Sequence, residues 1–201
     1  MPAARESLLD AACTALARRP WPAVRMVDVA ATAGVSRQTL YNEFGSKDGL
    51  ARALLRRETD TYLHGVERAL AVEGGPVDRL AAVSAWTIDA AHGSALTRAM
   101  LTGCWSERLP TPSRPGVSLS PVPAQRRADA GVPTPAELLA LVRDKAVNAL
   151  NGRARPKDTE ELAVVCESAV RMALSYVIAP SRKGEDPAES VREIIGRWST
   201  P

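Results

Sequence analysis

The sequence predicts an all-α protein, and three observations support that prediction. Aromatic residues make up only 4% of the 201 residues, while alanine, leucine and arginine are abundant, which favours helices over strands. Proline and glycine recur at intervals that suit helix starts and ends. No alternating apolar and polar pattern of useful length indicates a strand. We expect about nine helices: a three-helix N-terminal head, joined by a long helix to a larger helical bundle.

The first four helices are expected at residues 4–18, 27–33, 37–44 and 47–70. Pro20 stops the first helix. Gly34 ends the second, because a residue there must take the left-handed conformation that glycine accepts most readily. Ser36 is the N-cap of the third helix, which Gly45 closes, and Ser46 is the N-cap of the fourth.

The remaining helices are expected at residues 76–91, 94–105, 135–151, 158–178 and 186–198. Thr134 and Glu137 form a capping box around Pro135, a favoured first-turn residue. Residues 107–133 contain six prolines with serines and arginines between them, so we expect a long mobile loop. This loop is either a tolerated surface insertion or a functional segment, namely a lid over a pocket or a basic strap.

Composition limits the function less than it limits the fold. The net charge of +3 permits nucleic-acid binding without requiring it. Cys13, Cys104 and Cys166 are an odd number without CxxC spacing, so we expect buried thiols rather than a disulfide framework or a metal site, and no cofactor. The chain has no apolar run of the roughly 18 residues that a membrane span needs, and its N-terminus reads as an amphipathic helix rather than a signal peptide. We expect a cytoplasmic protein.

The stretch AATAGVSRQTLYNEFGSKDGL, residues 30–50, predicts a helix-turn-helix. Two short helices are joined by a glycine-containing turn, and six apolar positions close a small core: Val29, Ala30, Ala33, Val35, Leu40 and Phe44. The polar side chains lie on the opposite face of the third helix, where a recognition helix meets the DNA major groove. The alternative is a solvated polar helix on an ordinary bundle.

The polar side chains have the chemistry that DNA binding requires. Arg37 can pair with guanine and Gln38 with adenine through two hydrogen bonds each, and hydroxyl groups such as that of Tyr41 can donate to phosphates. Helix N-termini also bind phosphates, and Lys47 adds charge at one of them. The expected DNA-binding residues are Arg25, Ser36, Arg37, Gln38, Thr39, Tyr41, Asn42 and Lys47.

The same stretch closely resembles the helix-turn-helix signature of the tetracycline-repressor (TetR/AcrR) family of bacterial transcription regulators. The matching pieces are Ala30 with Ala33, Gly34-Val35-Ser36, Thr39-Leu40-Tyr41, Phe44, Ser46-Lys47 and Leu50. The resemblance implies a ligand-responsive regulator, a repressor, that binds a palindromic operator as a homodimer and is released by a small molecule. It divides the chain into a DNA-binding domain, 1–46, and an effector-binding and dimerisation domain, 47–201.

Two positions depart from the family pattern. Glu43 stands where members often carry a histidine that contacts phosphate. An ionised acid cannot donate to phosphate, so Glu43 is expected either to pair with a neighbouring base or to tune selectivity by repulsion. Arg25 and Met26 stand where the family often has a pair of threonines, so the hydroxyl cap of the second helix is missing, although Arg25 could reach a phosphate.

Two sets of body residues are expected to act in binding. Apolar periodicity, together with the resemblance, assigns a dimer interface to Leu162, Cys166, Ala169, Val170, Leu174, Val191, Ile194, Ile195 and Trp198. An intramolecular core is the alternative, because periodicity does not name the partner. An apolar effector would contact Trp86, Met100, Leu101, Trp105, Leu141 and Tyr176.

Two other functions are open. The protein could be a dimeric DNA-binding protein without an effector, in which the body only dimerises. A small helical enzyme is disfavoured, because His64 and His92 are far apart and belong to no catalytic motif.

Overall fold

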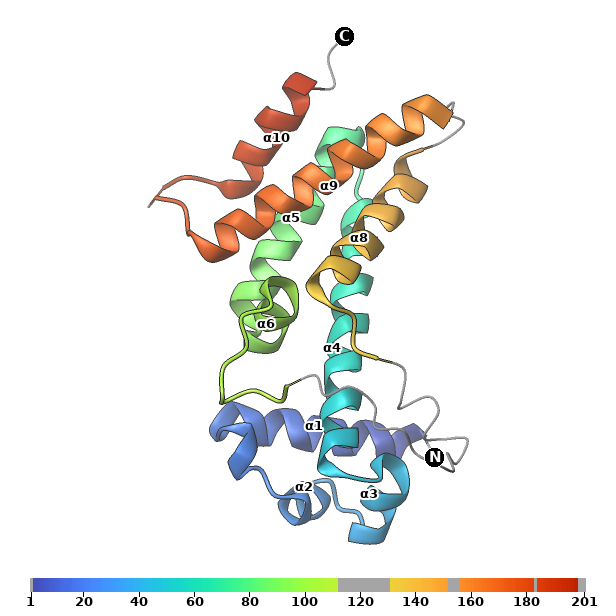
Figure 1. Ribbon diagram of the computed structural model, residues 1–201, viewed down its shortest axis with the longest axis vertical. Coiled ribbons are helices and arrows are strands. Elements are labelled where there is room, and N and C mark those ends of the chain that lie inside the picture. The colour runs from blue at the N-terminus through green and yellow to red at the C-terminus, as the bar shows by residue number, and fades with distance from the viewer. Residues whose placement is uncertain (1, 112–130, 152–155, 183, 199–201) are drawn as a thin grey trace. The chain divides into compact units, whose positions relative to one another are not determined.

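A computed structural model describes residues 2–111, 131–151, 156–182 and 184–198, and all regular structure in these ranges is helical (Figure 1). Nine α-helices and one short 3-10 helix lie there. The all-α prediction is confirmed. Of the predicted loop at 107–133, residues 112–130 lie outside the described part of the chain.

The chain divides into two compact units. The first comprises Met1–Thr59 and Trp105–Val132, and the second comprises Asp60–Cys104 and Pro133–Pro201. Helix α4 (Lys47–Leu70) gives its first half to the first unit and its second half to the second. The functional boundary between residues 46 and 47 stays a prediction, because the compact units divide inside α4.

The first unit is a small three-helix head completed by the start of α4. Helix α1 (Pro2–Arg18) packs against both α2 (Met26–Thr32) and α3 (Arg37–Phe44). Apolar side chains from all four helices are buried together: Leu8, Leu9, Ala12, Val29, Ala30, Leu40, Phe44, Leu50 and Leu54. This core fixes the position of α3, whose other face is exposed.

The second unit contains the end of α4 and five further helices. These are α5 (Pro76–Gly93), α6 (Ala95–Thr102), α8 (Pro135–Leu150), α9 (Pro156–Ile178) and α10 (Pro187–Trp198). Helix α9 packs on α5 and lies between α8 and α10 (Figure 1). The core of the second unit includes Leu80, Val83, Met100, Leu138, Val142, Cys166, Val170 and Ile195.

Predicted and observed helix boundaries differ by at most two residues, except at the end of α6. Helix α6 ends at Thr102 instead of residue 105, because Gly103 takes the left-handed conformation, at φ 73°, and caps the helix. Helix α9 begins at Pro156, two residues before its predicted start, as proline favours the first turn. The 3-10 helix η1 (Trp21–Ala23) between α1 and α2 was not predicted.

Candidate nucleic-acid interface

The turn between α2 and α3 holds the two helices in a helix-turn-helix. Gly34 is left-handed at φ 68°, as predicted, and Val35 N donates to Ala30 O at 3.0 Å. The hydroxyl of Ser36 accepts a hydrogen bond from Thr39 N at 3.0 Å, so the predicted N-cap is confirmed. Leu40 is fully buried, which anchors one face of α3 in the head.

The opposite face of α3 is exposed and polar. Arg37, Gln38, Tyr41 and Asn42 are all exposed, at the spacing of one helical face. The Tyr41 side chain is 49% exposed, which is unusual for a large aromatic residue. Thr39 is half-buried, and its hydroxyl oxygen lies 2.8 Å from that of Ser36, within hydrogen-bond distance. Capping therefore engages the two hydroxyl groups of Ser36 and Thr39, whereas the other four side chains face solvent.

The N-terminus of α4 lies next to the end of α3. Ser46 caps it, accepting from Gly49 N at 3.1 Å. The Lys47 ammonium donates to Pro22 O at 3.0 Å and lies 5.4 Å from the centre of the Trp21 ring. Burial lowers the pKa of Lys47, an effect that Asp48 opposes. Lys47 is thus held at the start of α4, with its ammonium group hydrogen-bonded to an uncharged carbonyl oxygen.

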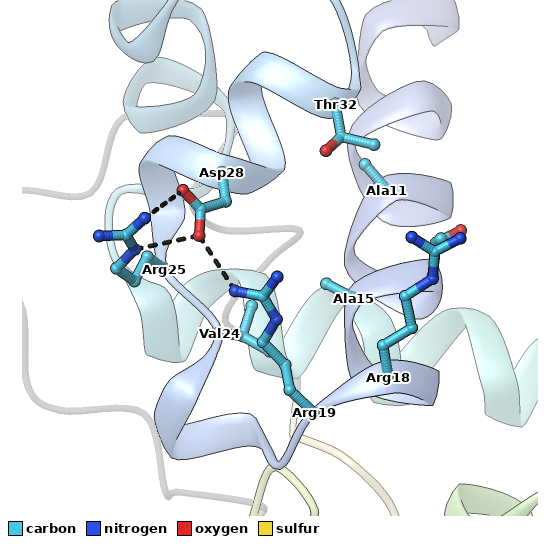
Figure 2. A pocket seen from close by; sticks show the side chains of 9 residues that line it. Ala11, Ala15, Arg18, Arg19, Val24, Arg25, Asp28 and Thr32 are labelled. Atoms are coloured by element: carbon cyan, nitrogen blue, oxygen red, sulfur yellow. Dashed lines mark hydrogen bonds and ion pairs between the residues drawn. The ribbon is translucent and has the colours of Figure 1, made fainter.

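Arg25 precedes α2 and is held by an acid of that helix. Its Nε and Nη2 donate to Asp28 at 3.0 and 2.9 Å, and Arg19 Nη1 donates to the same carboxylate at 3.2 Å. Figure 2 shows this trio at one side of a small pocket between α1 and α2, with Ala11 and Ala15 along α1. The hydrogen bond from Arg25 is the main cause that lowers the pKa of Asp28. The carboxylate of Asp28 thus accepts hydrogen bonds from two guanidinium groups.

Glu43 pairs with a base, one of the two roles expected for it. Its carboxylate lies 3.7 Å from Arg5 Nη1 on α1. The Arg5 guanidinium also lies 4.9 Å from the centre of the Phe44 ring. An arginine of α1 therefore contacts α3 where the family pattern has a phosphate-binding histidine.

The distribution of charge is a signal that the total of +3 conceals. Residues 1–59 contain nine Lys or Arg and six Asp or Glu, whereas residues 60–201 contain seventeen of each. The whole positive excess therefore belongs to the N-terminal segment that carries the helix-turn-helix. A local excess of this sign is what phosphate binding requires.

Residues 8–54 match the family described as bacterial regulatory proteins, tetR family. The head of the chain therefore resembles the tetR family, and the match lies within the first unit. It is 47% identical over 66 residues to the HTH-type transcriptional regulator AlkX of Mycobacterium tuberculosis, a match that covers 33% of this chain and 31% of AlkX. It is 40% identical over 74 residues to the HTH-type transcriptional repressor LfrR of Mycolicibacterium smegmatis, covering 37% and 38%. Each match therefore spans about a third of the relative's length, and both relatives are named as regulators, not enzymes.

The likeness to solved structures extends beyond the head. A tetR-family transcriptional regulator from Streptomyces coelicolor has a similar structure, with a TM-score of 0.56 at 17% identity over 98% of this chain and 79% of that chain. At this identity the likeness concerns the fold alone. The resemblance found in the helix-turn-helix is thus confirmed, and the all-helical body agrees with it.

The predicted effector residues have different environments. Met100 and Leu101 are buried, whereas Leu141 is 41% exposed. Trp86 and Tyr176 are half-buried, and Trp105 belongs to the first unit. Trp86 Nε1 donates to Tyr62 O at 3.0 Å, and its ring lies against Gly65. The effector set stays a prediction.

The predicted dimer residues are mostly core residues within the chain. Cys166, Ala169, Val170, Val191 and Ile195 are at most 1% exposed, because α5 covers this side of α9 and α10. Leu162 and Leu174 are half-buried, Ile194 is 39% exposed, and the side chain of Trp198 lies outside the described residues.

The exposed apolar side chains of α9 were not in the predicted set. Val164 is 63% exposed and Ile178 is 70% exposed. Together with the exposed residues Arg171 and Ser175 they follow one side of α9 at helical spacing. Spacing alone could have separated this stripe from the buried side of the helix, but it could not have shown which side faces α5.

Nothing in the described residues indicates a metal site, since no group of three His, Cys, Asp or Glu side chains is placed to hold an ion. His64 Nδ1 lies 2.7 Å from Asp60 O, and His92 is exposed at the end of α5. Among the described helices, none is long and apolar enough to span a membrane.

Proposed function

We propose that this protein is a ligand-responsive transcriptional repressor that binds a palindromic operator as a homodimer and is released by a small apolar effector. It would act in the cytoplasm, on chromosomal DNA. The observation that carries the proposal is the exposed polar face of α3, fixed to the head by the buried Leu40 and Phe44 and capped by Ser36. A helix anchored on one face and polar on the other is suited to the major groove.

The residues of this face divide into base-reading and phosphate-binding roles. Arg37 and Gln38 lie in the first turn of α3, the part of a recognition helix that reaches base edges. The exposed ring of Tyr41 would pack against the DNA, and its hydroxyl group would donate a hydrogen bond to a phosphate oxygen. Lys47 would exchange its hydrogen bond to Pro22 O for a charged phosphate oxygen, a stronger acceptor.

DNA binding is tested by selecting duplexes from a random pool and measuring affinity by fluorescence anisotropy. Arg37→Ala should relax the preference at one base pair by about 1–3 kcal/mol. Arg197→Ala removes the same charge from an exposed position of α10 and serves as the control. Equal effects of the two substitutions, or no sequence preference in the wild type, would contradict the role of α3.

The geometry of a palindromic operator supports the proposed homodimer. Two half-sites of a palindrome lie about 34–36 Å apart, so two recognition helices are needed to read both. The stripe with Val164 and Ile178 offers exposed apolar surface that a second copy would cover. In sedimentation experiments Val164→Glu should produce monomers and weaken operator binding. Val72→Glu, at a valine that is 38% exposed after the end of α4, should leave the dimer intact.

The effector is supported by the half-buried tryptophan Trp86 and the aliphatic character of the body. The close burial of Met100 and Leu101 favours the second candidate, a DNA-binding dimer without an effector. A panel of apolar metabolites separates the two. An effector should change tryptophan fluorescence and lower operator affinity together, whereas a panel without effect on either quantity favours the second candidate.

A further inference from the structure

The helix-turn-helix contains two acidic residues, which are unfavourable at a surface that meets phosphates. Residues 26–45 include Asp28 on α2 and Glu43 on α3 and no other Asp or Glu. Both side chains are partly exposed, at 28% and 24%. A carboxylate near a DNA backbone repels it, and water screens that repulsion only in part.

Each acid is paired with an arginine from the α1 segment. Arg19, directly after α1, donates to Asp28 at 3.2 Å. Arg5, near the start of α1, lies 3.7 Å from Glu43. The two arginines are fourteen positions apart, so the two ends of α1 reach two different helices of the motif. Contacts of α1 with both α2 and α3 agree with this arrangement.

The number of arginines that pair with the acid differs between the two sites. Arg5 and Glu43 balance each other, and the Phe44 ring, 4.9 Å from the guanidinium, helps to hold Arg5 in place. At Asp28 two guanidinium groups, from Arg19 and Arg25, face one carboxylate (Figure 2). The three side chains together carry one net positive charge beside the start of α2, and without Arg19 the charges of Arg25 and Asp28 would only cancel.

We propose that Arg5 and Arg19 are charge-compensating residues of the DNA interface: each neutralises the acid of one helix of the motif, so that α2 and α3 can approach the phosphates. The proposal deepens the proposed function and rests on it. These arginines act through Glu43 and Asp28 and are therefore positioning residues, separate from the side chains that read bases.

The first test is a gain of affinity. Glu43→Gln leaves Arg5 without its acid, so the interface gains one positive charge. We expect binding to any duplex, specific or random, to tighten by about three-fold to five-fold at moderate salt, with a steeper salt dependence. A damaged fold cannot produce tighter binding. Asp10→Asn is the matched control, because Asp10 on α1 is also paired with an arginine, Arg57 of α4, but lies outside the motif.

The second test is a rescue. Arg5→Gln and Arg19→Gln should each weaken binding by about three-fold to five-fold. The pairs Arg5→Gln with Glu43→Gln and Arg19→Gln with Asp28→Asn should return affinity to within about two-fold of the wild type, since each pair restores the local charge. Arg18→Gln is the matched control: Arg18 is the exposed neighbour of Arg19 on α1, and its loss should not be rescued by Asp28→Asn.

Three results would overturn the proposal. They are an unchanged or weaker affinity for Glu43→Gln, single arginine variants that bind like the wild type, and double variants that stay as weak as the single ones. The last result would mean that the arginines contact phosphate themselves. A wild-type protein that binds no duplex would refute the proposed function instead, so the two failures are distinguishable.

Discussion

The substitution Gly49→Ala tests how closely α4 fixes the position of the recognition helix. Gly49 is buried in the first turn of α4. A Cβ atom there would lie 1.8 Å from the carbonyl oxygen of Phe44, the last residue of α3, and 3.0 Å from its carbonyl carbon. Ordinary contact begins at 3.4 Å. The two helix ends would have to separate by about 1.6 Å, because both partners are backbone atoms that cannot rotate away.

The cost of this separation can be bounded. Overpacking of a closed site costs about 1–3 kcal/mol. Alanine is the better helix former by up to about 1 kcal/mol, which offsets part of it. We expect a net loss of about 1–2 kcal/mol in the free energy of unfolding. A displaced α3 also loses base contacts worth about 1–3 kcal/mol each, so operator affinity should fall at least about ten-fold.

Urea unfolding and anisotropy titrations measure the two effects separately. Gly196→Ala in α10 is the control, because nothing lies within 4 Å of the added Cβ atom. It should stabilise the protein by up to about 1 kcal/mol and leave DNA binding unchanged. If Gly49→Ala behaved like Gly196→Ala in both assays, the backbone contact between α3 and α4 would not constrain the recognition helix.

Three further substitutions or reactions have defined outcomes. Gly65→Ala would place a Cβ atom 2.0 Å from Trp86 Cε2, so the ring must move and lose its bond to Tyr62 O; tryptophan emission should shift to longer wavelength, and an unchanged spectrum would contradict the contact. Lys47→Met keeps an aliphatic chain over Trp21 but removes the charge, so the free energy of unfolding should change little. The slope of log K for DNA binding against log salt concentration should fall in magnitude by about 0.9, and an unchanged slope would show that Lys47 does not reach a phosphate. Cys104 is exposed and should react first with a thiol reagent at pH 8. Cys166 is fully buried, and burial raises its pKa to about 11, so it should react only when urea unfolds the protein. Early labelling of Cys166 would contradict its place in the core.

Helix boundaries could be predicted where they depend on neighbouring residues. Gly34 and Gly45 take positive φ angles, and Ser36 caps α3, because turn and cap chemistry involves atoms only a few positions apart. The same local chemistry misleads at Gly103, where the sequence predicts a helix that continues to residue 105. A single glycine does not show from sequence whether it ends a helix or lies within it, because the packing beyond it decides.

The partner of an apolar face could not be predicted, because periodicity shows that a face is apolar and not what covers it. In α9 the side with Cys166 and Val170 is buried against α5, whereas Val164 and Ile178 are left exposed. The sequence showed that α9 is apolar on more than one side. Only the fold shows which side remains exposed.

The recognition surface itself depends on two kinds of information. The exposed polar side chains of α3 are neighbours in sequence, so their common face could be predicted from helical spacing. Its charge depends also on α1, since Arg5 is 38 positions from Glu43. If α1 sets that charge, grafting the α3 sequence onto another head would transfer its base contacts together with an uncompensated Glu43. Such a graft should keep the sequence preference and lose affinity for every duplex, and an arginine at the position equivalent to Arg5 should restore that affinity.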